Sequence, residues 1–125
     1  MAEQKGCYGP IRLGTREDAG IINAIANPEG AGVVITRAFV NITTETGEAA
    51  RELDVGVAAD AVTTSDTIFD GIDPNAAAAL HDSMAPLGAG EENARIWGAN
   101  QWVNANVNNN NTGMVADLYI QYIRL

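Results

Sequence analysis

Alternation of apolar and polar residues with a period of two recurs along this chain and restricts it to β structure. In RELDVGVAA (51–59), Leu53, Val55 and Val57 alternate with polar or small residues. WVNANV (102–107) and ADLYIQY (116–122) repeat the pattern. Successive side chains of a strand point to opposite faces, so this period gives one buried and one solvated face, whereas a helix would scatter the same residues around its circumference. All three segments are therefore predicted to be strands.

Turn-forming residues separate further strand-like segments. AGIINAIA (19–26) and the β-branched VVITRAFVNIT (33–43) flank Asn27-Pro28-Glu29-Gly30. Proline fixes φ in such a turn, and glycine allows φ to be positive. The segment 108–113, with four asparagines followed by Thr and Gly, joins the last two alternating segments. Because Asn and Gly tolerate left-handed backbone, it is predicted to be a hairpin loop whose tip projects into solvent or against a neighbour.

Two regions lack a strand pattern. The alanine-rich stretch 75–84 predicts one or two helical turns, with Asn75 as a possible N-cap. Residues 1–18 contain several glycines and a proline, and they show no hydrophobic period. They are therefore expected to form an extended arm outside the packed domain.

The succession of short strands separated by turns, without a long helix, predicts the fold class. We expect an all-β protein, a jelly-roll-like antiparallel β-sandwich over residues 19–125 that is preceded by the extended N-terminal arm. A chain of 125 residues is long enough for one such domain.

The charge balance limits the possible partners. Lys and Arg total 7 against 16 Asp and Glu, a formal net charge of −9. Such a surface repels phosphate backbones, so no nucleic-acid partner is expected. The chain has no long apolar run and does not start like a signal peptide, so no membrane partner is expected and synthesis is expected in a cytoplasm.

Catalytic residue sets are sparse. His81 is the only histidine and Cys7 the only cysteine, and they lie far apart in the sequence. No phosphate-binding glycine loop or dinucleotide fingerprint is present, so neither enzymatic activity nor a cofactor is expected. The aspartates of the acidic segment 60–73 have the oxygen ligands that Ca²⁺ prefers, but their spacing does not match a helix-loop-helix calcium site. No metal site is assigned from the sequence, and calcium binding by this segment stays open.

Three segments carry a resemblance to a known class of protein. They are NPEGAGVVITRAFVNITT, ELDVGVAADAVTTSDTIFDGID and the C-terminal WGANQWVNANVNNNNTGMVADLYIQYIRL. Over residues 19–125 the chain resembles small virion structural proteins of tailed bacteriophages, of the head decoration or cement type. The resemblance implies a β-sandwich in the virion that binds the major capsid protein on the outside of the head, and a homotrimer is expected.

The contact residues expected for this function fall into two groups. The arm has three of the seven cations and is expected to contact the capsid through Tyr8, Ile11, Arg12, Leu13 and Arg16. Possible subunit contacts are Trp97, Trp102 and Tyr119. The alternative is a carbohydrate- or receptor-binding module of a tail fibre, which would use Trp102 and the asparagine run.

Overall fold

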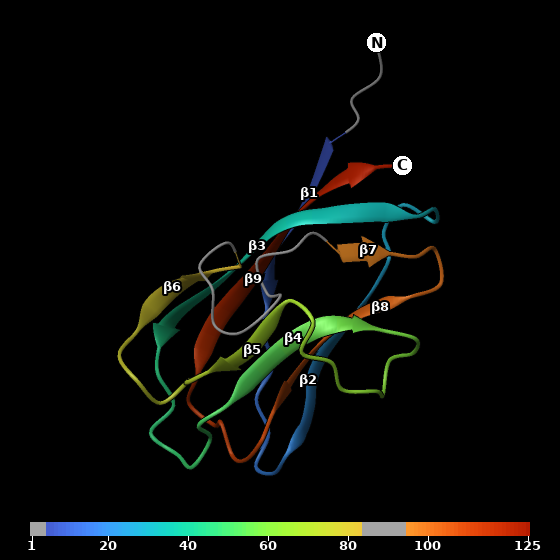
Figure 1. Cartoon of the computed structure of the whole chain (residues 1–125). Coiled ribbons are helices and arrows are strands. Elements are labelled where there is room, and N and C mark those ends of the chain that lie inside the picture. The colour runs from blue at the N-terminus through green and yellow to red at the C-terminus, as the bar shows by residue number, and fades with distance from the viewer. Residues whose placement is uncertain (1–4, 84–94) are drawn as a thin grey trace.

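The computed structural model describes residues 5–83 and 95–125, which contain nine strands (Figure 1). No helix in this part of the chain is long or apolar enough to span a lipid bilayer. The strands are β1 (Lys5–Arg12), β2 (Gly20–Ala26), β3 (Val33–Thr44), β4 (Leu53–Ala58), β5 (Phe69–Ile72), β6 (Ala79–Asp82), β7 (Arg95–Trp97), β8 (Trp102–Val107) and β9 (Val115–Arg124).

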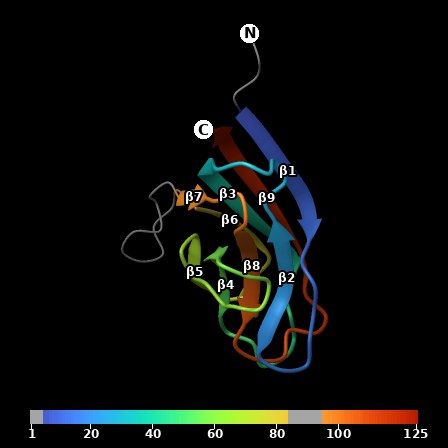
Figure 2. The ribbon, with the colours of Figure 1, turned by 90° about the vertical axis from the view of Figure 1, so that its right-hand side faces the viewer.

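The strands form two antiparallel sheets that pack face to face (Figure 2). Sheet A has the order β1-β9-β3-β6, and β7 pairs with the first residues of β3. Sheet B has the order β2-β8-β4-β5. The core lies between them, and its largest fully buried side chains include Trp97, Phe69, Ile42, Leu53, Ile72, Leu118 and Ile120.

Strand pairing follows a nested pattern. β1 pairs with β9, β2 with β8, β3 with β6, and β4 with β5. The first and third of these pairs lie in sheet A, and the second and fourth lie in sheet B. Such a nested set of antiparallel pairs, distributed alternately over two sheets, is a jelly roll. The predicted fold class is therefore confirmed.

The alternating segments are strands with the predicted faces. Leu53 and Val55 of β4 are fully buried, and Val57 packs against the core. In β9 the inward residues Ala116, Leu118, Ile120 and Tyr122 are all buried. The turn at 27–30 is also confirmed, since Gly30 has a φ of 69°.

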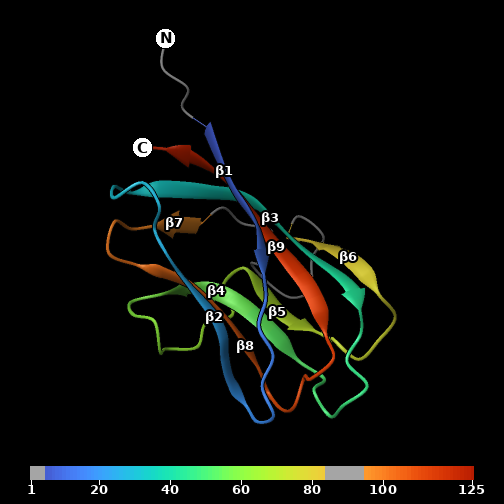
Figure 3. The ribbon, with the colours of Figure 1, turned by 180° about the vertical axis from the view of Figure 1, so that it is seen from behind.

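The prediction of an arm was wrong for the part of residues 1–18 that the structure describes. Lys5–Arg12 is the edge strand β1, paired with β9 from Lys5↔Ile123 to Arg12↔Asp117 (Figure 3). The register shifts between Tyr8 and Ile11, where the sequence has Gly9-Pro10. This irregularity, together with the glycines, removes the apolar period by which a strand is recognised.

Two further predictions were wrong. In the part of 75–84 that is described, Ala79–Asp82 forms β6 rather than a helical turn, because the edge of β3 offers hydrogen-bonding partners. The Ser83 hydroxyl oxygen, for example, accepts the Ala38 N–H at 2.7 Å. The segment 108–113 is not a hairpin loop, because β8 belongs to sheet B and β9 to sheet A. It connects the two sheets.

Candidate functional site

The residues expected to anchor an arm to the capsid are used within the fold. Leu13 is 2% exposed and belongs to the core, and Ile11 packs against it. The Arg12 guanidinium pairs with Asp117 at 2.8 Å, and that of Arg16 pairs with Asp18 at 2.9 Å. Of these five residues, Tyr8 alone is an exposed apolar side chain. Leu13 is therefore packed within the fold, whereas a capsid contact by the other four residues stays a prediction.

The three aromatic residues expected at a subunit contact are not brought together. Trp97 is fully buried, and its indole N–H donates to the Gln101 carbonyl, so it is not available to another subunit. Trp102 is half-buried on β8 of sheet B. Tyr119 is half-buried on β9 of sheet A. Trp102 and Tyr119 both point away from the core, but from opposite sheets.

The asparagine run holds loops together rather than forming an exposed tip. Asn111 is fully buried. Its side-chain oxygen accepts the Arg16 N–H at 2.8 Å, and its amide group donates to the Gly14 carbonyl at 3.3 Å. The Asn108 side chain accepts the N–H groups of Arg51 and Glu52, each at 3.1 Å. No described residue other than glycine has a positive φ, so these asparagines act through their side chains and not through left-handed backbone.

The outer face of β4 and β8 in sheet B is partly covered by the chain's own β4–β5 connection. A Cβ atom added at Gly56 would lie 2.2 Å from the Ser65 hydroxyl oxygen. The fully buried Asn104 donates to the carbonyls of Asp60 and Thr63, both at 2.8 Å. Gly56 and Ala58 are on the outer face of β4, which the alternating pattern predicts to be exposed to solvent. Both are buried in the structure.

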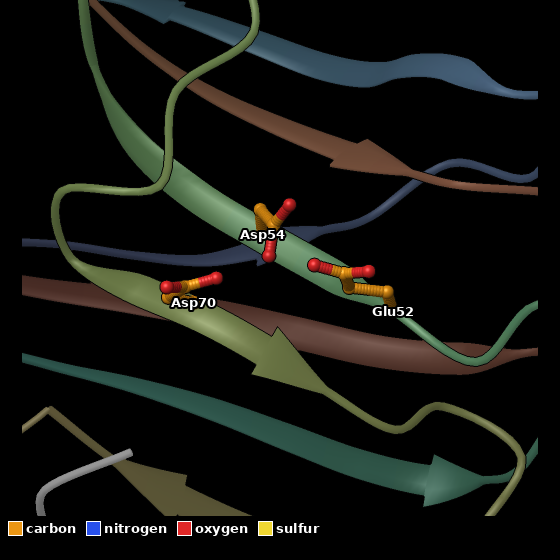
Figure 4. A group of neighbouring side chains, drawn as sticks. All are labelled: Glu52, Asp54 and Asp70. Atoms are coloured by element: carbon orange, nitrogen blue, oxygen red, sulfur yellow. The ribbon is translucent and has the colours of Figure 1, made fainter. Parts of the chain in front are cut away.

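An acidic cluster lies where the β4–β5 connection ends at β5. Glu52, Asp54 and Asp70 come from the approach to β4, from β4 and from β5 (Figure 4). One carboxylate oxygen of each lies within 4.8 Å of the others. The pKa of Asp54 is raised, first by burial and then by the neighbouring carboxylates, while the Gly71 N–H donates to it at 2.7 Å and opposes the rise.

The aspartates considered from the sequence as calcium ligands do not form one group. Asp60 binds within its own turn, where it accepts the Val62 N–H and the Thr63 hydroxyl. Asp73 accepts the Asn75 N–H in another turn. Asp70 belongs to the acidic cluster, and Asp66 lines a hollow of about 150 Å³ next to it. Sequence reasoning missed Glu52 and Asp54, because they precede the acidic segment and approach it only when β4 pairs with β5.

Among the described residues, sheet A has most of the exposed large apolar side chains. The described part has six exposed large apolar side chains. Leu80, Ile96 and Ile123 lie on the outer face of sheet A, and Leu125 follows β9. Tyr8 is on the edge strand β1, where its register partner is the core-facing Ile120. The sixth, Val62, lies in the β4–β5 connection. Val34 of β3 has two register partners, Ile96 on β7 and Ile123 on β9. Beside Ile123 is a hollow of about 380 Å³, lined by residues of β1, β3 and β9.

Cys7 and His81 do not form a catalytic pair. Cys7 is exposed on β1, and His81 lies on β6 at the opposite edge of sheet A. Two strands lie between β1 and β6, so the two residues are more than about 14 Å apart at the usual strand spacing. Burial lowers the pKa of His81.

Comparison with known proteins identified no relative of this chain. No family model, no curated protein and no solved structure matches this chain. Function is therefore inferred from the surfaces and side chains described above.

Proposed function

We propose that the protein is a non-enzymatic virion protein that binds the outside of a tailed-bacteriophage head shell and stabilises it. The observation that supports this best is the contrast between the two sheets. The β4–β5 connection covers part of the outer face of sheet B, whereas four of the six exposed large apolar side chains of the described part belong to sheet A. Clustered exposed apolar residues on an acidic, otherwise polar protein are typical of a protein-binding surface.

The attachment surface is thus the outer face of sheet A rather than an N-terminal arm. Ile96 is 65% exposed and Ile123 is 38% exposed, and both flank Val34 in one row across the sheet. Phe39 and Tyr119 form a second, half-buried row on the same face. These side chains gain from removal of water when they are covered by a shell subunit. Many copies on one shell strengthen the attachment through avidity.

A binding experiment with purified shells that lack the protein tests this proposal. The double variant Ile96→Asp/Ile123→Asp removes two apolar contacts of about 1.5–3 kcal/mol each, so shell affinity falls about 100-fold or more. The matched control is Val62→Asp, because Val62 is 79% exposed but lies away from sheet A. Co-sedimentation and imaging of the particles measure the number of bound copies.

The two variants separate the possible results. Normal decoration by Val62→Asp and loss of decoration by the folded double variant support the proposal. Decoration by the double variant at wild-type affinity contradicts it, as does the absence of the wild-type protein from purified particles.

The alternative, a sugar- or receptor-binding module, has weaker support. It would use Trp102, which is half-buried, and the asparagine run. The side chains of Asn108 and Asn111 are already bound to the protein's own backbone. Glycan-array binding that is lost in Trp102→Ala would favour this alternative over shell binding.

A further inference from the structure

We propose that the outer face of sheet B holds a calcium ion, bound by Asp54 together with Glu52, Asp70 and the side-chain oxygen of Asn106. The site is independent of the shell-binding proposal, since it lies on the other sheet. Its ligands come from β4 and the residues before it, from β5 and from β8. They meet only in the folded chain.

The spacing of the three carboxylates suits one ion. Their ligand oxygens lie within 4.8 Å of one another. Oxygens on opposite sides of a Ca²⁺ ion are separated by about 4.8 Å, twice a bond of about 2.4 Å. Figure 4 shows Asp54 between Glu52 and Asp70, with the carboxylate groups directed toward a common space. A single ion can therefore contact all three.

None of the ion pairs found among the described residues includes Glu52, Asp54 or Asp70. The ion pairs of the described part join Arg12, Arg16, Arg37 and Arg124 to other acids. Carboxylates this close repel one another. A divalent cation would remove the repulsion.

Asn106 gives an independent indication of a ligand. Asn106 is 9% exposed, and its Oδ1 atom is buried without a hydrogen-bond partner. Asn106 is the register partner of Asp54, and both line the hollow of about 150 Å³ together with Thr64, Ser65 and Asp66. A buried polar oxygen without a partner is costly, and such oxygens are rare in native proteins. A bound cation in this hollow supplies the missing partner.

The donor set favours Ca²⁺ over other metals. Every side chain in the cluster and the hollow offers oxygen, and none offers nitrogen or sulfur as a soft donor. Ca²⁺ accepts six to eight oxygens in irregular geometry, whereas Mg²⁺ requires a nearly ideal octahedron. Asp66 and the hydroxyls of Thr64 and Ser65 lie in the same hollow and can complete the shell, directly or through water. Binding would fasten the β4–β5 connection to sheet B.

Isothermal titration of the chelator-treated full chain with CaCl₂ tests the site. The wild type is expected to bind one ion per chain, with a Kd of roughly 10⁻⁵ to 10⁻³ M, and to bind Mg²⁺ more weakly. Asp54→Asn and Asp70→Asn each weaken Ca²⁺ binding about 10-fold or more, because each removes a charged ligand. Asn106→Leu also weakens it. Glu45→Gln changes the charge equally at an exposed position in another loop, and it leaves binding unchanged.

Thermal melting gives the second measurement. Ca²⁺ raises the Tm of the wild type and of Glu45→Gln, because a ligand that binds the folded state stabilises it. It leaves the Tm of Asp70→Asn, whose side chain is at the surface, nearly unchanged. The absence of saturable binding by the wild type up to about 10 mM, ten times the weakest expected Kd, overturns the proposal. Wild-type affinity in the two aspartate variants, or in Asn106→Leu, overturns it as well.

Discussion

Asn111 shows how one polar side chain can fix the path of several segments. It is fully buried, and its main chain and side chain together bind the backbone of Gly14 and Arg16. These contacts tie the connection between β8 and β9 to the residues that follow β1. An amide side chain suits this position because it both donates and accepts hydrogen bonds.

Replacement of Asn111 tests this role. Asn111→Ala leaves the partly buried N–H of Arg16 without its side-chain acceptor, so we expect a loss of about 1–3 kcal/mol in the free energy of unfolding. Asn109→Ala is the control from the same run, since Asn109 is exposed, and a change within about 0.5 kcal/mol is expected. Chemical denaturation measures both. Equal stability of the two variants would show that Asn111 does not hold the loops together.

Asp54 predicts a pH effect of definite sign. Burial and neighbouring carboxylates raise its pKa in the folded protein, so its ionised form destabilises the fold. This cost is present at neutral pH, above the folded pKa, and it disappears as pH falls below the unfolded pKa. In the presence of a chelator, Asp54→Asn is therefore expected to be more stable than the wild type at pH 7, with a smaller difference at pH 3. Melting curves at the two pH values check this, and a variant less stable at pH 7 would contradict it.

At the scale of elements, β1 has the largest consequence. It covers the edge of β9 and leads directly into Leu13, whose N–H donates to the Ala116 carbonyl at 2.9 Å. An N-terminal segment with this pairing is part of the sandwich. The contacts of β1 with β9 therefore stabilise the fold.

Truncation and point substitution test the role of this segment. Leu13→Ala is expected to cost about 2–5 kcal/mol, because it removes a buried side chain from the core. Deletion of residues 1–16 removes β1 as well and is expected to lower the Tm strongly or to prevent folding. Thr15→Ala, at an exposed position in the same segment, is the control. If the truncated protein melts at the wild-type temperature, the segment is an arm after all.

At the scale of the whole molecule, the two sheets differ in what covers them. Sheet B is partly covered by the β4–β5 connection, through contacts such as those of Asn104. Sheet A has most of the exposed large apolar side chains of the described part. The net charge of −9 limits indiscriminate association, so contacts between copies must come from specific surfaces.

The expected homotrimer stays a prediction, and it can be tested on the free protein. Light scattering at micromolar concentration should give three times the mass of 13.1 kDa. Closed assemblies cover apolar patches that a monomer would expose, which is the physical reason for the expectation. A monomer in solution that is also monomeric on the particle would contradict it. The mass of the Ile96→Asp/Ile123→Asp variant shows whether the same face joins the copies.

The sequence by itself determined the strands and their inward faces. Alternation in β4, β8 and β9 is a local property, because period two assigns each side chain to one face whatever the partner strand is. The jelly-roll class followed from the number and spacing of such segments. The 27–30 turn was equally local, since it depends on Pro28 and Gly30.

Only the tertiary structure decided which edges and loops these strands meet. β1 and β6 have weak patterns of their own, and they become strands because β9 and β3 offer them unpaired edges. The burial of Asn111 and the grouping of Glu52 with Asp70 arise from contacts between residues far apart in the chain. Local periodicity contains no information about such contacts. Leu13 and Asn111, which were expected to reach outward, are therefore packed. The ligands of the proposed calcium site come together only when β4, β5 and β8 lie side by side.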